Sequence, residues 1–149
     1  MGYSDGTGES GTLQGIEGMK DILVPVSPGE LIDKITILQL KKNNITDGVK
    51  LANVSYEFSE LMAHADRSIP QSAELSALWE KLLEINSQLW VIEDDIRACE
   101  QKQDFGPEFI RLARAVYKTN DRRAALKKEI NLLLGSAIVE EKSYHGDEA

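Results

Sequence analysis

The sequence predicts an all-α fold, a four-helix bundle in which the last two helices form a long antiparallel hairpin and short extended segments flank the bundle. Two observations support this fold class. Apolar residues recur at spacings of three and four through four separate stretches, which is typical of amphipathic helices. Each stretch is also bounded by helix start or stop residues, such as Ser27 with Pro28 at the first and Gly135 after the last.

Composition indicates one domain. The chain has 149 residues, 42% of them hydrophobic, which is enough for one real core. Residues 1–18 hold six of the eleven glycines and few apolar side chains, so they are expected to form a flexible tail. This tail is either a leader added to the protein or an alternative upstream start, and the single helical domain is predicted over residues 19–149.

Charge and cysteine content exclude several classes of protein. A net charge of −8 disfavours binding to nucleic acid, because such proteins neutralise phosphates with clustered Lys and Arg. The single Cys99 forms no intramolecular disulfide, and no Cys/His cluster suggests zinc. Glu60 and His64 are one helical turn apart but supply only two ligands, so we predict neither a metal nor a cofactor. No segment resembles a membrane span or secretory signal, and a cytoplasmic location is expected.

The first two helices follow from their end signals. Ser27 is predicted to cap a helix whose first turn holds Pro28, with Glu30 completing a capping box. The preceding residues 21–26, DILVPV, are short, β-branched and interrupted by proline, which favours an extended strap over a central strand. A second helix is expected after Asp47 and Gly48, ending before Pro70.

The third helix carries the strongest periodicity. Its seam alternates spacings of three and four, as in a coiled coil: Leu75, Leu78, Leu82, Ile85, Leu89, Ile92, Ile96 and Cys99. Gly106 and Pro107 then form a turn, so the fourth helix begins at Pro107 or Glu108 and returns alongside the third until Gly135.

A second apolar line lies about 60° around the third helix, at roughly 100° per residue, and consists of Trp79, Leu83 and Trp90. The third helix must therefore contact more than one neighbour. We interpret this line as a candidate interface of a homodimer, with complete burial inside a monomer as the alternative.

The core stripe of the fourth helix turns polar at Thr119 and Arg123. Residues equally far from the hairpin turn face one another, which places Glu93 and Asp94 near Tyr117 and leaves Asn120 and Arg123 near the level of Trp90. Two interpretations stay open. The charged residues either form an ion-pair network that fixes helix register, the more common arrangement, or bind a small anionic ligand together with Arg97.

Four segments of the sequence resemble a known family: VPVSPGELIDKITIL, WVIEDDIRACE, FGPEFIRLARAVYKTNDRRA and GSAIVEEKSY. Over about residues 20–144 the chain is similar to the bacterial domain of unknown function 6165. The resemblance implies a small, mostly helical protein, often encoded beside genes for glycosyl transfer and surface polysaccharides, and it implies no activity or catalytic residue. The motif residues that would form a ligand site are Asp33, Lys34, Glu93, Asp94, Arg97, Asn120, Arg123, Glu140 and Lys142.

The leading functional hypothesis is therefore a bacterial, cytoplasmic interaction or assembly module that self-associates or binds a protein partner. The absence of a nucleophile paired with a base supports this hypothesis over an enzyme. The alternative is a binder or enzyme of a phosphorylated or nucleotide-linked sugar in surface polysaccharide metabolism. Neither nucleic acid nor a membrane is expected as a partner.

Overall fold

The computed structural model describes residues 18–146, so almost all of the predicted tail lies outside the described residues. Four helices make up the fold: α2 (Pro28–Asn44), α3 (Gly48–Ser68), α4 (Ala73–Gln101) and α5 (Pro107–Leu133). No strand occurs within residues 18–146. The predicted all-α fold with a long hairpin is confirmed.

The helix ends are set by local side chains, as the sequence predicts. Ser27 Oγ accepts a hydrogen bond from the backbone N–H of Glu30 at 3.1 Å, and Asp47 and Ser72 cap α3 and α4 in the same way. The capping box is only half formed, because the Glu30 carboxylate bonds Lys127 Nζ at 2.7 Å. After α5, Gly135 takes a left-handed φ of 65° and closes the helix end.

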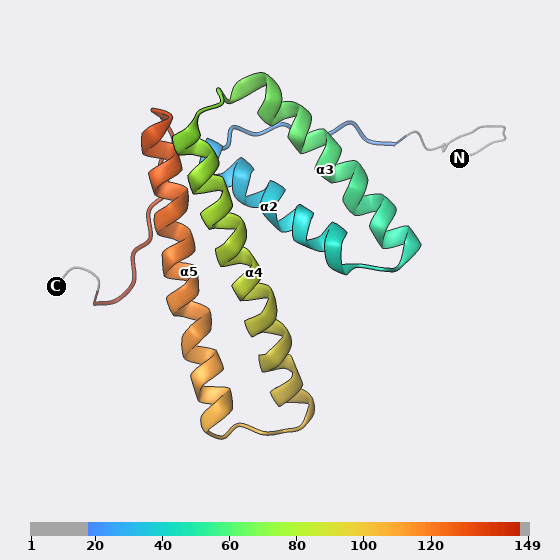
Figure 1. The fold of residues 1–149 in the computed structure, drawn as a ribbon, viewed down its shortest axis with the longest axis vertical. Helices are drawn as coiled ribbons and strands as arrows, with labels where there is room; N and C mark the ends of the chain where they lie inside the picture. Colours follow the sequence, from blue (N-terminus) through green and yellow to red (C-terminus); the bar gives the residue numbers. More distant parts are fainter. Residues whose placement is uncertain (1–17, 147–149) are drawn as a thin grey trace, which may run out of the picture.

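The helices are arranged as a long hairpin with two further helices on one side of it (Figure 1). Helices α4 and α5 run antiparallel, and their register is visible in a 2.9 Å hydrogen bond from Arg122 to Gln88. Helix α2 packs against both of them near one end of the hairpin. Helix α3 packs along the outer side of α2, so α2 is the central helix of this half.

The core lies where α2 meets the hairpin. Its buried residues come from all four helices and from the link between α3 and α4: Ile32, Ile35, Ala65, Ile69, Leu75, Leu82 and Ile130. The hairpin continues well beyond α2 as an arm of only two helices (Figure 1). Cys99 and Leu112 are buried in the arm, and an edge-to-face contact between Phe105 and Phe109 closes its tip.

Two segments without regular structure flank the bundle. Residues 18–27 lead into α2, and their apolar side chains are largely exposed. Residues 135–146 turn back alongside α5 (Figure 1). None of the described helices combines the length and the apolarity needed to cross a bilayer.

Candidate functional site

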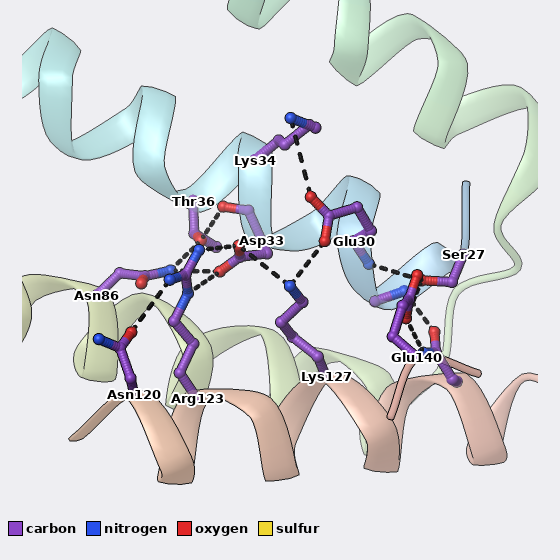
Figure 2. Close-up of polar contacts among 12 residues, drawn as sticks. Ser27, Glu30, Asp33, Lys34, Thr36, Asn86, Asn120, Arg123, Lys127 and Glu140 are labelled. Atoms are coloured by element: carbon purple, nitrogen blue, oxygen red, sulfur yellow. Dashed lines mark hydrogen bonds and ion pairs between the residues drawn. The ribbon is translucent and has the colours of Figure 1, made fainter. Parts of the chain in front are cut away.

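The buried carboxylate of Asp33, on the second turn of α2, is the centre of the polar cluster (Figure 2). Arg123 of α5 binds it with two nitrogens, Nε to Oδ1 at 2.9 Å and Nη2 to Oδ2 at 2.5 Å. The Asp33 side chain is 1% exposed and that of Arg123 28%. A bidentate fork of this kind is the strongest geometry for a carboxylate and a guanidinium.

Helix α4 joins the same cluster through Asn86. Its Nδ2 donates to Asp33 Oδ1 and to Thr36 Oγ1, each at 2.9 Å, and Thr36 Oγ1 donates to the backbone carbonyl of Asp33 at 2.8 Å. Arg123 also donates to Asn120 Oδ1 at 3.2 Å. One buried point therefore joins α2, α4 and α5 (Figure 2).

The environment keeps Asp33 ionised. Burial by itself would raise the pKa of Asp33, because it penalises the charged form. Hydrogen bonds from Arg123 and Asn86, with the positive charges of Arg123 and Lys127, outweigh burial and hold the pKa below its ordinary value. The same bond to Asp33 raises the pKa of Arg123. The pair is charged across the physiological range.

Lys127 extends the cluster by one turn of α5. Its Nζ lies 2.7 Å from Glu30 Oε1 and 3.7 Å from Asp33 Oδ2, and the other Glu30 oxygen is 3.8 Å from Lys34 Nζ. Two carboxylates of α2, Asp33 and Glu30, thus pair with two cations of α5, Arg123 and Lys127, in two successive layers.

The N-terminus of α2 is held against α5 and the C-terminal segment. The backbone N–H of Gly29 donates to Asn131 Oδ1 at 2.7 Å, which supplies a partner for a helix-end donor. The Glu140 carboxylate accepts from Ser27 Oγ at 2.9 Å and from Asn131 Nδ2 at 3.1 Å. Only glycine fits here, because a Cβ on Gly29 would lie 2.5 Å from the Lys127 carbonyl oxygen.

Two clefts lie beside this cluster. The larger, about 720 Å³, runs between α5 and the C-terminal segment. The four cations that line it all bond carboxylates of the chain: Arg123 with Asp33, Lys127 with Glu30, Lys128 with Glu141 and Lys142 with Asp121. The smaller, about 380 Å³, lies between α2 and the hairpin and is lined by Ile37, Leu40, Asn86, Leu89, Trp90, Glu93, Asp94, Asn120 and Arg123.

The structure places the predicted ligand residues in three settings. Asp33, Asn120 and Arg123 meet in the cluster. Glu93 and Asp94 line the smaller cleft with Asn120 and Arg123. Arg97 forms an exposed pair with Glu93 at 3.3 Å, and Lys34 is an exposed partner of Glu30. Their assignment to ligand binding stays a prediction.

The sequence did not predict that the cluster includes Thr36, Asn86, Lys127 and Asn131. It also did not predict that Glu30 is a partner of Lys127. Asn86 did carry a signal. It falls on the same helical face as Leu82 and Leu89, both buried, and a lone amide in such a stripe needs a polar partner. Nothing local identified that partner as Asp33.

The candidate interface residues differ in burial. Trp79 packs against the core cluster of the chain's own bundle, and Leu83 is half-buried. Trp90 is half-buried and forms one wall of the smaller cleft. Their role in an interface between copies stays a prediction.

The cluster is a set of paired acids and bases. Within residues 18–146, no group of three or more His, Cys, Asp or Glu side chains is arranged to hold a metal ion. His64 bonds Arg67 at 3.1 Å on the surface of α3. The geometry joins helices strongly and presents few unpaired charges to a ligand.

Comparison with known proteins gives one family. No curated protein and no solved structure matches the chain significantly. A family model described as "Family of unknown function (DUF6165)" matches residues 22–148, which includes all four helices and most of both flanking segments. On this match the chain belongs to the DUF6165 family.

Proposed function

We propose that this protein is an interaction and assembly module that associates with a second copy of itself. The observation that supports this proposal is the apolar surface of residues 19–26, just before α2. Five apolar side chains there are between 44% and 84% exposed: Met19, Ile22, Leu23, Val24 and Val26. Large contiguous patches of exposed apolar side chains mark interaction surfaces.

The energetics favour covering this segment. Burying one Leu or Ile side chain contributes about 1.5–3 kcal/mol, so covering several of them exceeds the energy of any exposed ion pair in the molecule. A second copy is the simplest cover, since a two-fold dimer buries both segments at once and is the most common form of self-association.

The polar cluster supports the same function indirectly. It fixes α2 against the hairpin through a buried fork and two layers of ion pairs, which gives a rigid platform for a docking surface. Its cations are already neutralised by carboxylates of the chain. An anionic ligand would have to displace one of these carboxylates from its cation.

Self-association is tested by sedimentation equilibrium or light scattering over protomer concentrations from about 1 to 100 μM. We expect a monomer–dimer equilibrium that the double variant Ile22→Ser/Leu23→Ser weakens by at least tenfold. The matched control is Val49→Ser, because Val49 is 75% exposed but lies on α3. A chain that stays monomeric throughout this range contradicts the proposal.

The sugar hypothesis is tested by thermal unfolding with nucleotide-linked and phosphorylated sugars. We expect no stabilisation, because the cations around the larger cleft are paired. A ligand at about one hundred times its dissociation constant would stabilise the fold by about 2.7 kcal/mol. A stabilisation of that size, lost in Lys142→Ala, would replace the present proposal with a ligand-binding function.

A further inference from the structure

We infer that the C-terminal segment, residues 136–146, is an autoinhibitory strap over an anion-binding socket. The socket consists of Ser27, Lys128 and Asn131. In the closed chain its ligands are two carboxylates of the strap, those of Glu140 and Glu141. The strap opens while the four helices stay folded, and the open socket binds a small oxyanion such as phosphate. This inference is independent of the proposed self-association, because all these contacts lie within one copy.

The strap lies on the outside of the bundle. Apart from Ser136 and Val139, which are half-buried, each of its residues is exposed, and none belongs to the buried core. The larger cleft, about 720 Å³, remains between the strap and α5, so the strap does not pack closely along that helix. Opening the strap therefore exposes little apolar surface and leaves the core intact.

Two buried side chains hold the Glu140 carboxylate (Figure 2). Ser27 and Asn131 are each 1% exposed, and they donate to Glu140 from Oγ at 2.9 Å and from Nδ2 at 3.1 Å. Their acceptor atoms are already used. Ser27 Oγ accepts from the N–H of Glu30, and Asn131 Oδ1 accepts from the N–H of Gly29. These bonds aim both donors at the carboxylate, so the socket is preorganised for an oxyanion.

The charges around the socket favour an anion. Lys128 lies one turn before Asn131 on α5, and its Nζ is 2.8 Å from Glu141 Oε1. Among residues 18–146, no other carboxylate pairs with Lys128, so opening the strap leaves this cation free. The N-terminus of α2 adds a partial positive charge.

Two acids lie near enough to matter. Glu30 is in the first turn of α2, but its carboxylate pairs with Lys127 Nζ at 2.7 Å. Asp121 loses Lys142 when the strap opens. Asp121 precedes Lys128 by seven positions, or about 10 Å along α5, so it does not replace Glu141 as the partner of Lys128. The strap carboxylates are thus the anions that compete for the socket.

The outer attachments of the strap exchange readily. The side chains of Glu141 and Lys128 are 67% and 43% exposed, and those of Asp121 and Lys142 are 60% and 33% exposed. Exposed ion pairs of this kind contribute little and are screened by salt. Tethering gives the strap carboxylates an effective concentration on the order of millimolar, so the closed chain excludes a free anion below that concentration.

Phosphate binding by the full chain tests the socket. Glu140→Ala/Glu141→Ala removes both internal anions, and its dissociation constant for inorganic phosphate should be at least tenfold lower than that of the parent chain. Titration calorimetry measures this at a constant ionic strength of about 0.15 M. The control is Glu57→Ala/Glu60→Ala, which removes two exposed carboxylates from α3. Equal affinities of the two double variants would show a general charge effect and overturn the inference.

A third substitution locates the bound phosphate. Adding Lys128→Ala to Glu140→Ala/Glu141→Ala removes the cation of the socket, so phosphate affinity should return to the parent level. Unchanged affinity in this triple variant would place the phosphate elsewhere and overturn the assignment.

Limited proteolysis tests the opening itself. Lys142 is the single trypsin site within residues 136–146, and its Nζ lies 2.7 Å from Asp121 Oδ1. Trypsin should cut after Lys142 at least fivefold faster in Glu140→Ala than in the parent chain, with the helical circular dichroism unchanged. Each rate is divided by that of a free peptide of residues 136–146 carrying the same substitution. An unchanged ratio, or a loss of helix in the variant, would overturn the strap.

Discussion

Two forks between an arginine and a carboxylate have nearly the same geometry in different parts of the molecule. Arg123 holds Asp33 through Nε at 2.9 Å and Nη2 at 2.5 Å, and Arg111 holds Glu108 through the same two nitrogens at 3.0 and 2.6 Å. The first pair joins residues 90 positions apart, and its carboxylate is 1% exposed. The second pair is three positions apart on α5, and its side chains are 65% and 55% exposed.

Burial and sequence separation decide how much a bidentate arginine–carboxylate pair contributes to tertiary structure. The Arg111–Glu108 pair forms within one helix, is hydrated and screened by salt, and adds little to tertiary structure. The Arg123–Asp33 pair aligns α2 on α5, and losing Arg123 leaves the buried Asp33 carboxylate without its main counter-charge. Substitutions in matched positions test this difference.

The largest expected effect comes from Arg123→Ala. Removing one partner of a buried pair destabilises by about 3–5 kcal/mol, because the Asp33 carboxylate stays buried with its main counter-charge gone. Urea denaturation should show this loss, with Arg111→Ala nearly indistinguishable from the parent chain. Similar losses in the two variants would mean that the buried position confers no special role.

Gly29→Ala should have the next largest effect. The new Cβ would lie 2.5 Å from the Lys127 carbonyl oxygen and 2.8 Å from Asn131 Oδ1, so α2 must move away from α5. We expect a loss of about 1–3 kcal/mol in chemical denaturation. Gly48→Ala is the control, because nothing lies within 4 Å of its Cβ position, and it should be neutral or slightly stabilising.

The pH dependence of stability should trace to Asp33. Its pKa is lowered in the folded state, so its contribution is fully present above the unfolded pKa of about 4 and is lost as pH falls through the folded pKa. Asp33→Asn removes this titrating carboxylate and should therefore flatten the acid limb of a plot of unfolding free energy against pH. Glu108→Gln should leave that limb unchanged in moderate salt, and an equal effect of both would contradict the assignment.

The smallest expected effect is at the C-terminal segment. Glu140→Ala removes the bonds to Ser27 and Asn131, which are worth about 0.5–1.5 kcal/mol each. Hydrogen exchange should then increase in residues 136–146 with little change in the core. Glu141→Ala, which removes an exposed pair with Lys128, should change that exchange much less.

Local signals predicted most of the fold. The caps at Ser27 and Asp47, the turn at Gly106 and Pro107 and the stop at Gly135 all act within a few residues, so they can be recognised without tertiary information. Counting back from a single turn predicted that Asn120 and Arg123 lie near the level of Trp90, and these three residues line the same cleft.

The sequence by itself therefore determined which residues form helices, where each helix ends and which face of it is buried, because these properties depend on neighbours three or four residues away. Only the tertiary structure decided that Asp33 meets Arg123 and Asn86, that Gly29 lies against the α5 backbone and that Glu140 reaches Ser27. Periodicity marks a face as buried without naming the helix that covers it, and these partners are 53 to 113 positions apart.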